Sequence, residues 1–304
     1  MSLLAKAKSG VQPHAQLSTI YGPPGVGKTT FVSKVQGLLL ADIEDGSKSL
    51  DILRLGSDDL PTFEALESLI QELLTTQHDN KAIAIDSVTT LEHLIAKKIC
   101  QENNVNELAD IAFGKGSLYA KEKLKGFLTK LVELKNTKNM DVWFIGHSQV
   151  KKFNDPTLLQ QFDRYTLQCN EAFGQEIIRQ CDNVYFVKYD VQTSVDKNTK
   201  KAKGISDGSR VMFTRYAAGF DAKTRLNLPE SLPFDYDEYM KAVSSYAPKA
   251  SNDIVKDIEA LLIKLAPHDA DLTALAKDKL KAAGNDNTKL QRVKEKLLDA
   301  TNAL

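Results

Sequence analysis

Short apolar runs alternate with longer amphipathic segments over the first two-thirds of the chain. The runs have the length of buried β-strands, and the longer segments repeat their apolar residues every three or four positions, as helices do. This alternation predicts βαβ units, and therefore an α/β fold with a mostly parallel central sheet. The predicted strands are Leu17–Tyr21, Leu38–Asp42, Ala82–Asp86, Asp141–Gly146 and Val184–Tyr189. The predicted helices are Lys28–Gln36, Thr62–Thr75, Thr90–Asn103 and Leu118–Asn136.

The pattern changes after the last of these strands. Two β-rich runs, Val191–Val195 and Arg210–Tyr216, predict a C-terminal antiparallel hairpin that is connected by the Lys-rich loop Lys197–Gly208. A helix is expected around Tyr236–Tyr246, after a stretch that contains prolines.

The last part of the chain has the spacing of a small helical tail. Small and polar residues at 247–252 are typical of a linker. Amphipathic spacing then predicts two or three short helices, at Ile254–Leu265, Ala270–Ala283 and Thr288–Ala300. The predicted domains are an N-terminal extension (1–17), a core (18–246), the linker (247–252) and a small helical region (253–304).

The composition is that of an ordinary globular protein. The hydrophobic content of 42% excludes a disordered chain, and the balance of 40 Lys and Arg residues against 40 Asp and Glu residues, a formal net charge of zero, excludes a polybasic nucleic-acid coat. The three cysteines form no CxxC pair, which favours a reducing compartment without a structural zinc. No apolar run approaches the ~18 residues of a membrane span, so a cytoplasmic location and no membrane partner are expected.

The clearest chemical signal is Gly22–Thr29, which reads G-P-P-G-V-G-K-T between a predicted strand and a predicted helix. Its glycines let the backbone close around a phosphate chain, with N–H groups pointing inward at a helix N-terminus. Lys28 is expected to bridge the β- and γ-phosphates and Thr29 to bind Mg²⁺, so ATP and Mg²⁺ are the expected cofactors. The residues expected to contact the nucleotide are Gly22, Pro23, Pro24, Gly25, Val26, Gly27, Lys28, Thr29 and Thr30.

A second buried strand ends in a carboxylate, Asp86, which is followed by the hydroxyl of Ser87. Asp86 is expected to hold Mg²⁺ through water, with Ser87 supporting that arrangement. Ser87 or Asp86 is also a candidate N-cap for the next helix, and that structural role is compatible with the metal role.

Ser87 stands where motor ATPases of the AAA+ class usually place a catalytic Glu, so the general base is expected elsewhere. The strand Leu38–Asp42 runs into an acidic segment that contains Glu44, and this resembles the strand end of RecA-type recombinases. The resemblance implies that Glu44 orients and deprotonates the attacking water, with Asp42 as the competing candidate. It also implies a γ-phosphate sensor after the strand at 141–146, for which the chain offers both His147 and Gln149.

More specifically, several segments in order resemble a phage group of shortened RecA-like ATPases associated with single-strand annealing and recombination. Together they cover roughly residues 15–235, and they are Asp42–Gly46, Phe113–Gly116, Gly146–Lys151, Asp163–Tyr165 and Ala222–Pro229. The resemblance implies a RecA-like P-loop NTPase core that hydrolyses ATP and acts on single-stranded DNA, with a bacterial host cytoplasm as its location.

The pair Lys223 and Arg225 resembles the Lys-x-Arg element that hexameric helicases insert into a neighbouring subunit's nucleotide site. That resemblance implies a homo-oligomer in which both side chains stabilise transition-state charge in trans. A basic turn without a phosphate contact is the alternative.

Two segments resemble the DNA-binding loops of recombinases, Asp110–Ser117 and Val150–Phe173. They combine cations for phosphates with rings for base stacking, although the rings are also candidates for the core. The Lys-rich run Lys197–Lys203 is either a solvated loop or a guide for a DNA strand. The expected DNA-binding residues are Lys115, Lys151, Lys152, Phe153, Arg164 and Tyr165.

Two other functions stay open. One is a ring-forming helicase, translocase or loader ATPase, and the other is a nucleotide-gated module whose C-terminal helices dock a partner such as a single-strand-binding or other replication or recombination protein. A pure switch does not need a catalytic base at Glu44, whereas an annealing ATPase does. About 17 residues precede the first strand, which argues against an autonomous filament-forming recombinase.

Overall fold

The computed structural model describes residues 14–155, 160–195, 202–205, 207–246, 252–283 and 287–302. They divide into two compact units, one formed by Pro13–Ala242 and one that includes Val243–Leu304. Each unit has its own hydrophobic core, so each is described by itself.

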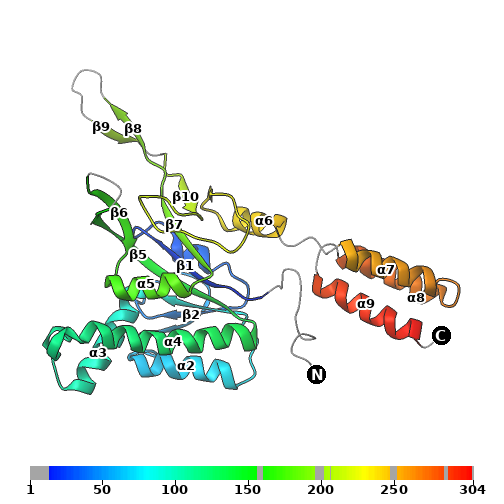
Figure 1. The fold of residues 1–304 in the computed structure, drawn as a ribbon, viewed down its shortest axis with the longest axis horizontal. Helices are drawn as coiled ribbons and strands as arrows, with labels where there is room; N and C mark the ends of the chain where they lie inside the picture. The colour runs from blue at the N-terminus through cyan, green and yellow to red at the C-terminus, as the bar shows by residue number, and fades with distance from the viewer. Residues whose placement is uncertain are drawn as a thin grey trace. The chain divides into compact units, whose positions relative to one another are not determined.

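The larger unit is built on a mixed sheet of nine strands among the described residues, in the order β11-β10-β7-β1-β5-β4-β2-β3, with β6 paired to β5 (Figure 1). The strands are β1 Leu17–Gly22, β2 Leu38–Asp42, β3 Leu53–Gly56, β4 Ala82–Asp86, β5 Asp141–Phe153, β6 Phe162–Leu167, β7 Asn183–Tyr189, β10 Arg210–Phe213 and β11 Ser231–Pro233. The pairs among β1, β2, β3, β4, β5 and β7 are parallel, and those of β10 with β7 and β11 are antiparallel. The predicted α/β class with a mostly parallel sheet is confirmed.

The parallel register decides where the chemistry lies. β5 lies between β1 and β4, and β2 follows β4, so the carboxyl ends of these four strands share one edge of the sheet. In this register Gly22 lies opposite His147, and Asp86 lies opposite both Asp42 and Ile145. Residues that follow these strands are therefore gathered at one site.

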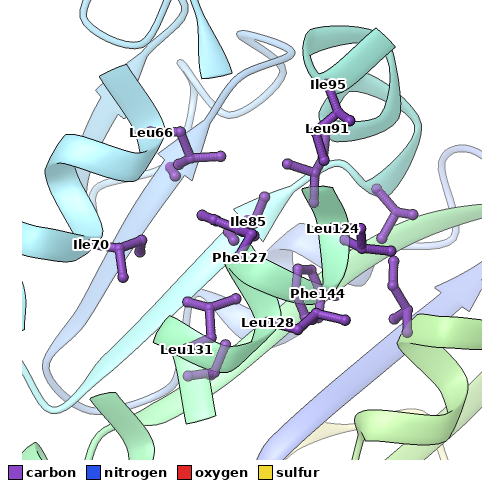
Figure 2. Packing of buried hydrophobic residues seen from close by; sticks show 14 of the residues in the cluster. Leu66, Ile70, Ile85, Leu91, Ile95, Leu124, Phe127, Leu128, Leu131 and Phe144 are labelled. Atoms are coloured by element: carbon purple, nitrogen blue, oxygen red, sulfur yellow. The ribbon is translucent and has the colours of Figure 1, made fainter. Parts of the chain in front are cut away.

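Helices cover both faces of the sheet. They are α1 Lys28–Val32, α2 Phe63–Thr75, α3 Val88–Asn103, α4 Gly116–Lys138, α5 Glu171–Gln180 and α6 Tyr236–Tyr246, with 3₁₀ turns at Leu108–Asp110 and Ala112–Gly114. The apolar sides of α2, α3 and α4 pack on one face of the sheet, where Phe127 of α4, Ile85 of β4 and Phe144 of β5 belong to one buried cluster (Figure 2). On the other face Trp143 lies against the rings of Phe31, Tyr185 and Tyr239.

An antiparallel hairpin follows β7, but the predicted pairing was wrong. Val191–Val195 was expected to pair with Arg210–Tyr216, whereas β8 (Gln192–Val195) pairs with β9 (Ala202–Ile205) and β10 pairs with β7. Both arms are short β-rich runs, and such runs do not encode which neighbour they join. Most of the Lys-rich run, 197–201, lies outside the described residues.

Two further boundaries differ from expectation. The first helix ends at Val32, because the chain continues in tight turns to Gly37, which has a φ of 66°. The expected loop 150–173 is instead the end of β5, the antiparallel strand β6 and the start of α5, as far as the structure describes it. Antiparallel pairing satisfies backbone groups that a loop would leave to solvent.

The smaller unit contains α7 Asn252–Leu265, α8 Ala270–Ala283 and α9 Asn287–Asn302. Their buried residues form a separate apolar core that includes Ile258, Leu262, Leu290 and Leu297. Within the described part of the whole chain, no helix is both long and apolar enough to span a bilayer.

Candidate nucleotide site

The segment Gly22–Thr29 forms a loop between the end of β1 and the start of α1. Gly25 and Gly27 have φ angles of 74° and 96°, a region that side-chain-bearing residues rarely adopt. A Cβ at Gly27 would also come within 2.7 Å of Arg210 Nη1, so glycine is required there for two reasons. The loop therefore has the compact, strand-to-helix form that its sequence predicts.

Lys28 is buried inside this loop. Its Nζ donates to the carbonyl oxygens of Gly22 (3.0 Å) and Pro23 (2.9 Å). Burial lowers the pKa of Lys28 to about 8, against the opposing influence of the carboxylates of Asp86 and Glu44. The ammonium is thus held by weakly bound carbonyl partners, which a phosphate group can replace.

The two predicted Mg²⁺ ligands lie side by side. Thr29 Oγ1 donates to Asp86 Oδ2 at 2.6 Å, and burial raises the pKa of Asp86. Proteins usually bind Mg²⁺ through one or two carboxylates together with substrate phosphates and waters, and this Thr–Asp pair fits that donor set. The described residues hold no group of three or more His, Cys, Asp and Glu side chains placed for a metal.

Glu44 lies beside this pair, held by three donors. Its carboxylate accepts hydrogen bonds from Ser87 Oγ and from Thr90 Oγ1 (2.9 Å), and His147 Nε2 lies 3.2 Å away. Because a carboxylate only accepts, the His147 nitrogen is the donor. These hydrogen bonds, that of His147 foremost, lower the pKa of Glu44 to about 2. Glu44 is therefore an ionised, oriented carboxylate.

Asp42, the competing candidate for the base, uses its carboxylate in hydrogen bonds to the backbone. It is fully buried, and its carboxylate accepts from the N–H groups of Gly46 (3.0 Å) and Ser47 (2.9 Å) and from the Ser47 hydroxyl. These bonds close the turn that carries Glu44. The geometry thus favours Glu44 as the base and gives Asp42 a structural role.

His147 and Gln149 point the same way along β5 but have different partners. His147 lies at Glu44, and its buried Nδ1 has no hydrogen-bond partner in the described part of the chain. Gln149 Nε2 donates to the carbonyls of Leu167 (3.0 Å) and Cys169 (3.3 Å), at the end of β6. His147, not Gln149, is the side chain at the phosphate edge.

Ser87 has the N-cap role that the sequence allows, together with a partner that was not predicted. It is the N-cap of α3, where its side chain faces Thr90 N at 3.5 Å, and it also donates to Glu44. The Asp86–Ser87 peptide bond is cis.

Two residues at the loop were missed by the sequence reasoning. Arg210 Nη1 donates to Val26 O (3.0 Å), and the Tyr189 hydroxyl donates to Gly25 O (3.1 Å). Tyr189 ends β7, which is paired with β1, whereas Arg210 comes to the loop through the antiparallel pairing of β10 with β7. No local motif signals that pairing.

Lys223 and Arg225 lie away from their own nucleotide loop. Lys223 pairs through its backbone with Val184, and Arg225 Nη1 forms an ion pair with buried Asp182 at 3.1 Å. Since β7 runs parallel to β1 and Val184 lies opposite Thr19, these positions are at the amino end of β7, about 10 Å of strand before the level of Gly22.

The predicted DNA-binding residues are in varied settings. Lys151 and Lys152 are exposed on β5, and Lys115 lies 5.6 Å from the ring of Phe113, which is 93% exposed. Phe153 packs on Phe162, and the ring of Tyr165 packs on Phe186. Arg164 is buried and ion-paired with Asp221, so its guanidinium is not open to DNA.

Comparison with known proteins gives a family and structural likenesses. The family model for the AAA domain matches residues 15–226. None of the curated proteins matches the chain. Among solved structures, the crystal structure of the RadB recombinase is 16% identical, with coverage of 68% of this chain and 92% of that chain and a TM-score of 0.34. The family assignment rests on the family model, which spans more than half of the 304 residues. The chain therefore belongs to the AAA domain family.

Proposed function

We propose that this chain binds ATP with Mg²⁺ at Gly22–Thr29 and hydrolyses it, as a RecA-like ATPase. The observation that carries the proposal is the position of Glu44, an ionised carboxylate held by Ser87, Thr90 and His147 beside the Thr29–Asp86 pair. A nucleotide switch needs the phosphate loop and the metal ligands, but it does not need a base oriented in this way.

Each of the chain's own groups has a defined part in the reaction. Lys28 exchanges the carbonyls of Gly22 and Pro23 for phosphate oxygens, and Thr29 and Asp86 hold Mg²⁺, which neutralises charge on the phosphates when bound. Glu44 accepts a hydrogen bond from the attacking water and takes its proton. His147 keeps the carboxylate oriented and ionised.

We further propose that the protein acts as a homo-oligomer on single-stranded DNA, in recombination or annealing of the phage type, with a single-strand-binding or related protein as a candidate partner. Exposed Lys151 and Lys152 next to the hairpin of β5 and β6 support DNA binding. The side chains of Lys223 and Arg225 contact Arg179 O and Asp182 and not their own loop, which supports a role in a neighbouring subunit's site.

Steady-state ATP turnover with and without single-stranded DNA tests this proposal. Lys28→Ala and Glu44→Gln should each lower turnover by a factor of about 100 or more, because general-base catalysis alone contributes roughly 10²–10⁴. Glu64→Gln, a carboxylate on α2 paired with Lys98, is the matched control and should stay near wild type. Full turnover in Glu44→Gln would remove Glu44 as the base, and turnover indifferent to DNA would remove the DNA role.

A further inference from the structure

Tyr216 is an exposed ring that rests on a buried arginine. The Arg164 side chain is 7% exposed, and its Nη2 lies 2.5 Å from Asp221 Oδ1. Its guanidinium lies between the rings of Phe153 (4.8 Å) and Tyr216 (5.1 Å). This stacking fixes the Tyr216 side chain, although 62% of the residue is exposed to solvent.

The segment that carries Tyr216 is also tied to the β5–β6 hairpin. Tyr165 N, on β6, donates to Gly219 O at 2.8 Å, and a bridge joins Tyr165 to Phe220. An exposed aromatic side chain that its neighbours already hold in place loses little conformational freedom when a flat ligand stacks on it.

Tyr216 lines a groove at the β7–β10 side of the sheet, with a volume of about 760 Å³. Its lining combines three cations with three aromatic rings: Lys188, Phe213, Arg215, Tyr216, Phe220 and Lys223. One acidic residue, Glu230, also lines it.

The cations of this groove are held in place by protein groups. Lys188 Nζ lies 5.7 Å from the centre of the Phe213 ring, and Arg215 Nη2 donates to Leu228 O at 3.2 Å. Neither cation has a carboxylate partner among these contacts, so both keep positive charge available to an anion.

We propose that this groove binds single-stranded nucleic acid, with Tyr216 stacking on a base and Lys188 and Arg215 contacting phosphates. Rings for stacking beside cations for phosphates are the two elements that sequence-tolerant strand binding requires. The inference rests on the proposed function in taking single-stranded DNA as the ligand. It adds a site on β7, β10 and the segment after β10, separate from Lys151 and Lys152 on the hairpin of β5 and β6.

Binding of a fluorescent oligothymidylate to the full chain, followed by anisotropy over a range of salt concentrations, tests this site. Tyr216→Ala should weaken binding roughly tenfold, the effect of losing one stacked base, while Tyr216→Phe keeps the ring and should bind as wild type does. Lys188→Ala and Arg215→Ala should each reduce the salt slope by about 0.7, the value for one phosphate of a single strand. Lys241→Ala, an exposed cation on α6, should change neither quantity.

The outcomes separate this inference from the proposed function. If the wild type binds the oligonucleotide and Tyr216→Ala binds equally well, the groove is not a strand site and the proposed function stands. If the wild type does not bind, the DNA role and this inference both fail.

Photocross-linking of the wild type to a bromodeoxyuridine oligonucleotide locates the contact without any variant. The cross-linked peptide should contain Tyr216. Cross-links confined to other peptides would overturn the proposal. Labelling of Tyr216 by a photoreactive ATP analogue instead of the oligonucleotide would also overturn it.

Discussion

At the scale of single residues, Asp182 shows how one buried carboxylate joins three segments of the larger unit. It accepts hydrogen bonds from Leu17 N (2.9 Å) and Lys135 Nζ (2.8 Å), and it pairs with Arg225. Burial alone would raise the pKa of Asp182, but the Lys135 hydrogen bond and the other two partners together lower it. Asp182 is therefore ionised in the folded state at neutral pH, at the start of β7.

The lowered pKa of Asp182 predicts a pH dependence of stability. Because its folded pKa lies below its unfolded value, the ionised group stabilises the protein above the unfolded pKa, ~4, and this is lost as pH falls through the folded pKa. Asp182→Asn should lower the free energy of unfolding at pH 7 and flatten its acid dependence, as measured by chemical denaturation. Asp58→Asn, at an exposed site, is the control, and an unchanged acid dependence in Asp182→Asn would contradict the expectation.

Single residues also show what the sequence alone could and could not locate in the site. Glu44, Asp86 and His147 follow buried strands whose apolar runs are unmistakable, and the parallel sheet brings such strand ends together. Arg210 reaches the same loop only because β10 pairs with β7, which depends on tertiary contacts. Arg164, an expected DNA contact, is instead buried and paired with Asp221. The sequence around a charged residue on a strand does not show which distant residue it pairs with.

At the scale of elements, burial on both faces made the central strands predictable. β2 and β4 have the predicted bounds, and both are buried along their full length. β3 is short and half-exposed, so its apolar signal is weak and it was missed. α5 was missed although Asn170 caps it through Ala172 N, because the resemblance to recombinases led us to expect a loop there.

Two helix caps offer a matched pair of variants at this scale. Ser87 caps α3 and Thr62 caps α2, where its side chain accepts from Ala65 N. Replacing either by Ala should cost about 1 kcal/mol of stability, as measured by denaturant unfolding. Only Ser87→Ala also removes a donor to Glu44, so it alone should lower ATP turnover. Equal turnover in both variants would show that the Ser87–Glu44 hydrogen bond has no part in the reaction.

At the scale of the whole molecule, the two units have separate cores, and the nucleotide site lies entirely in the larger one. The cations that resemble trans-acting fingers are at the other end of the sheet from that site. The proposed trans role of these cations requires that the amino end of one sheet meets the candidate nucleotide site of another.

Mixing two inactive variants tests whether the sites are shared between subunits. A subunit with Lys28→Ala lacks the loop cation, and one with Arg225→Ala lacks the finger, so each alone should be inactive. In a mixture, some sites pair an intact loop with an intact Arg225, and turnover should be partly restored. Absence of rescue at any mixing ratio would leave Arg225 as the local partner of Asp182.

The placement of Trp143 has a spectroscopic consequence. It is the one tryptophan in the sequence, it is 4% exposed, and its ring lies 6.4 Å from that of Phe31, on the helix that begins in the nucleotide loop. Its emission therefore reports on the larger unit alone, at the base of the site, without any label. The tail helices add to the far-ultraviolet circular dichroism but not to this emission, so the two signals together separate the unfolding of one unit from that of the other.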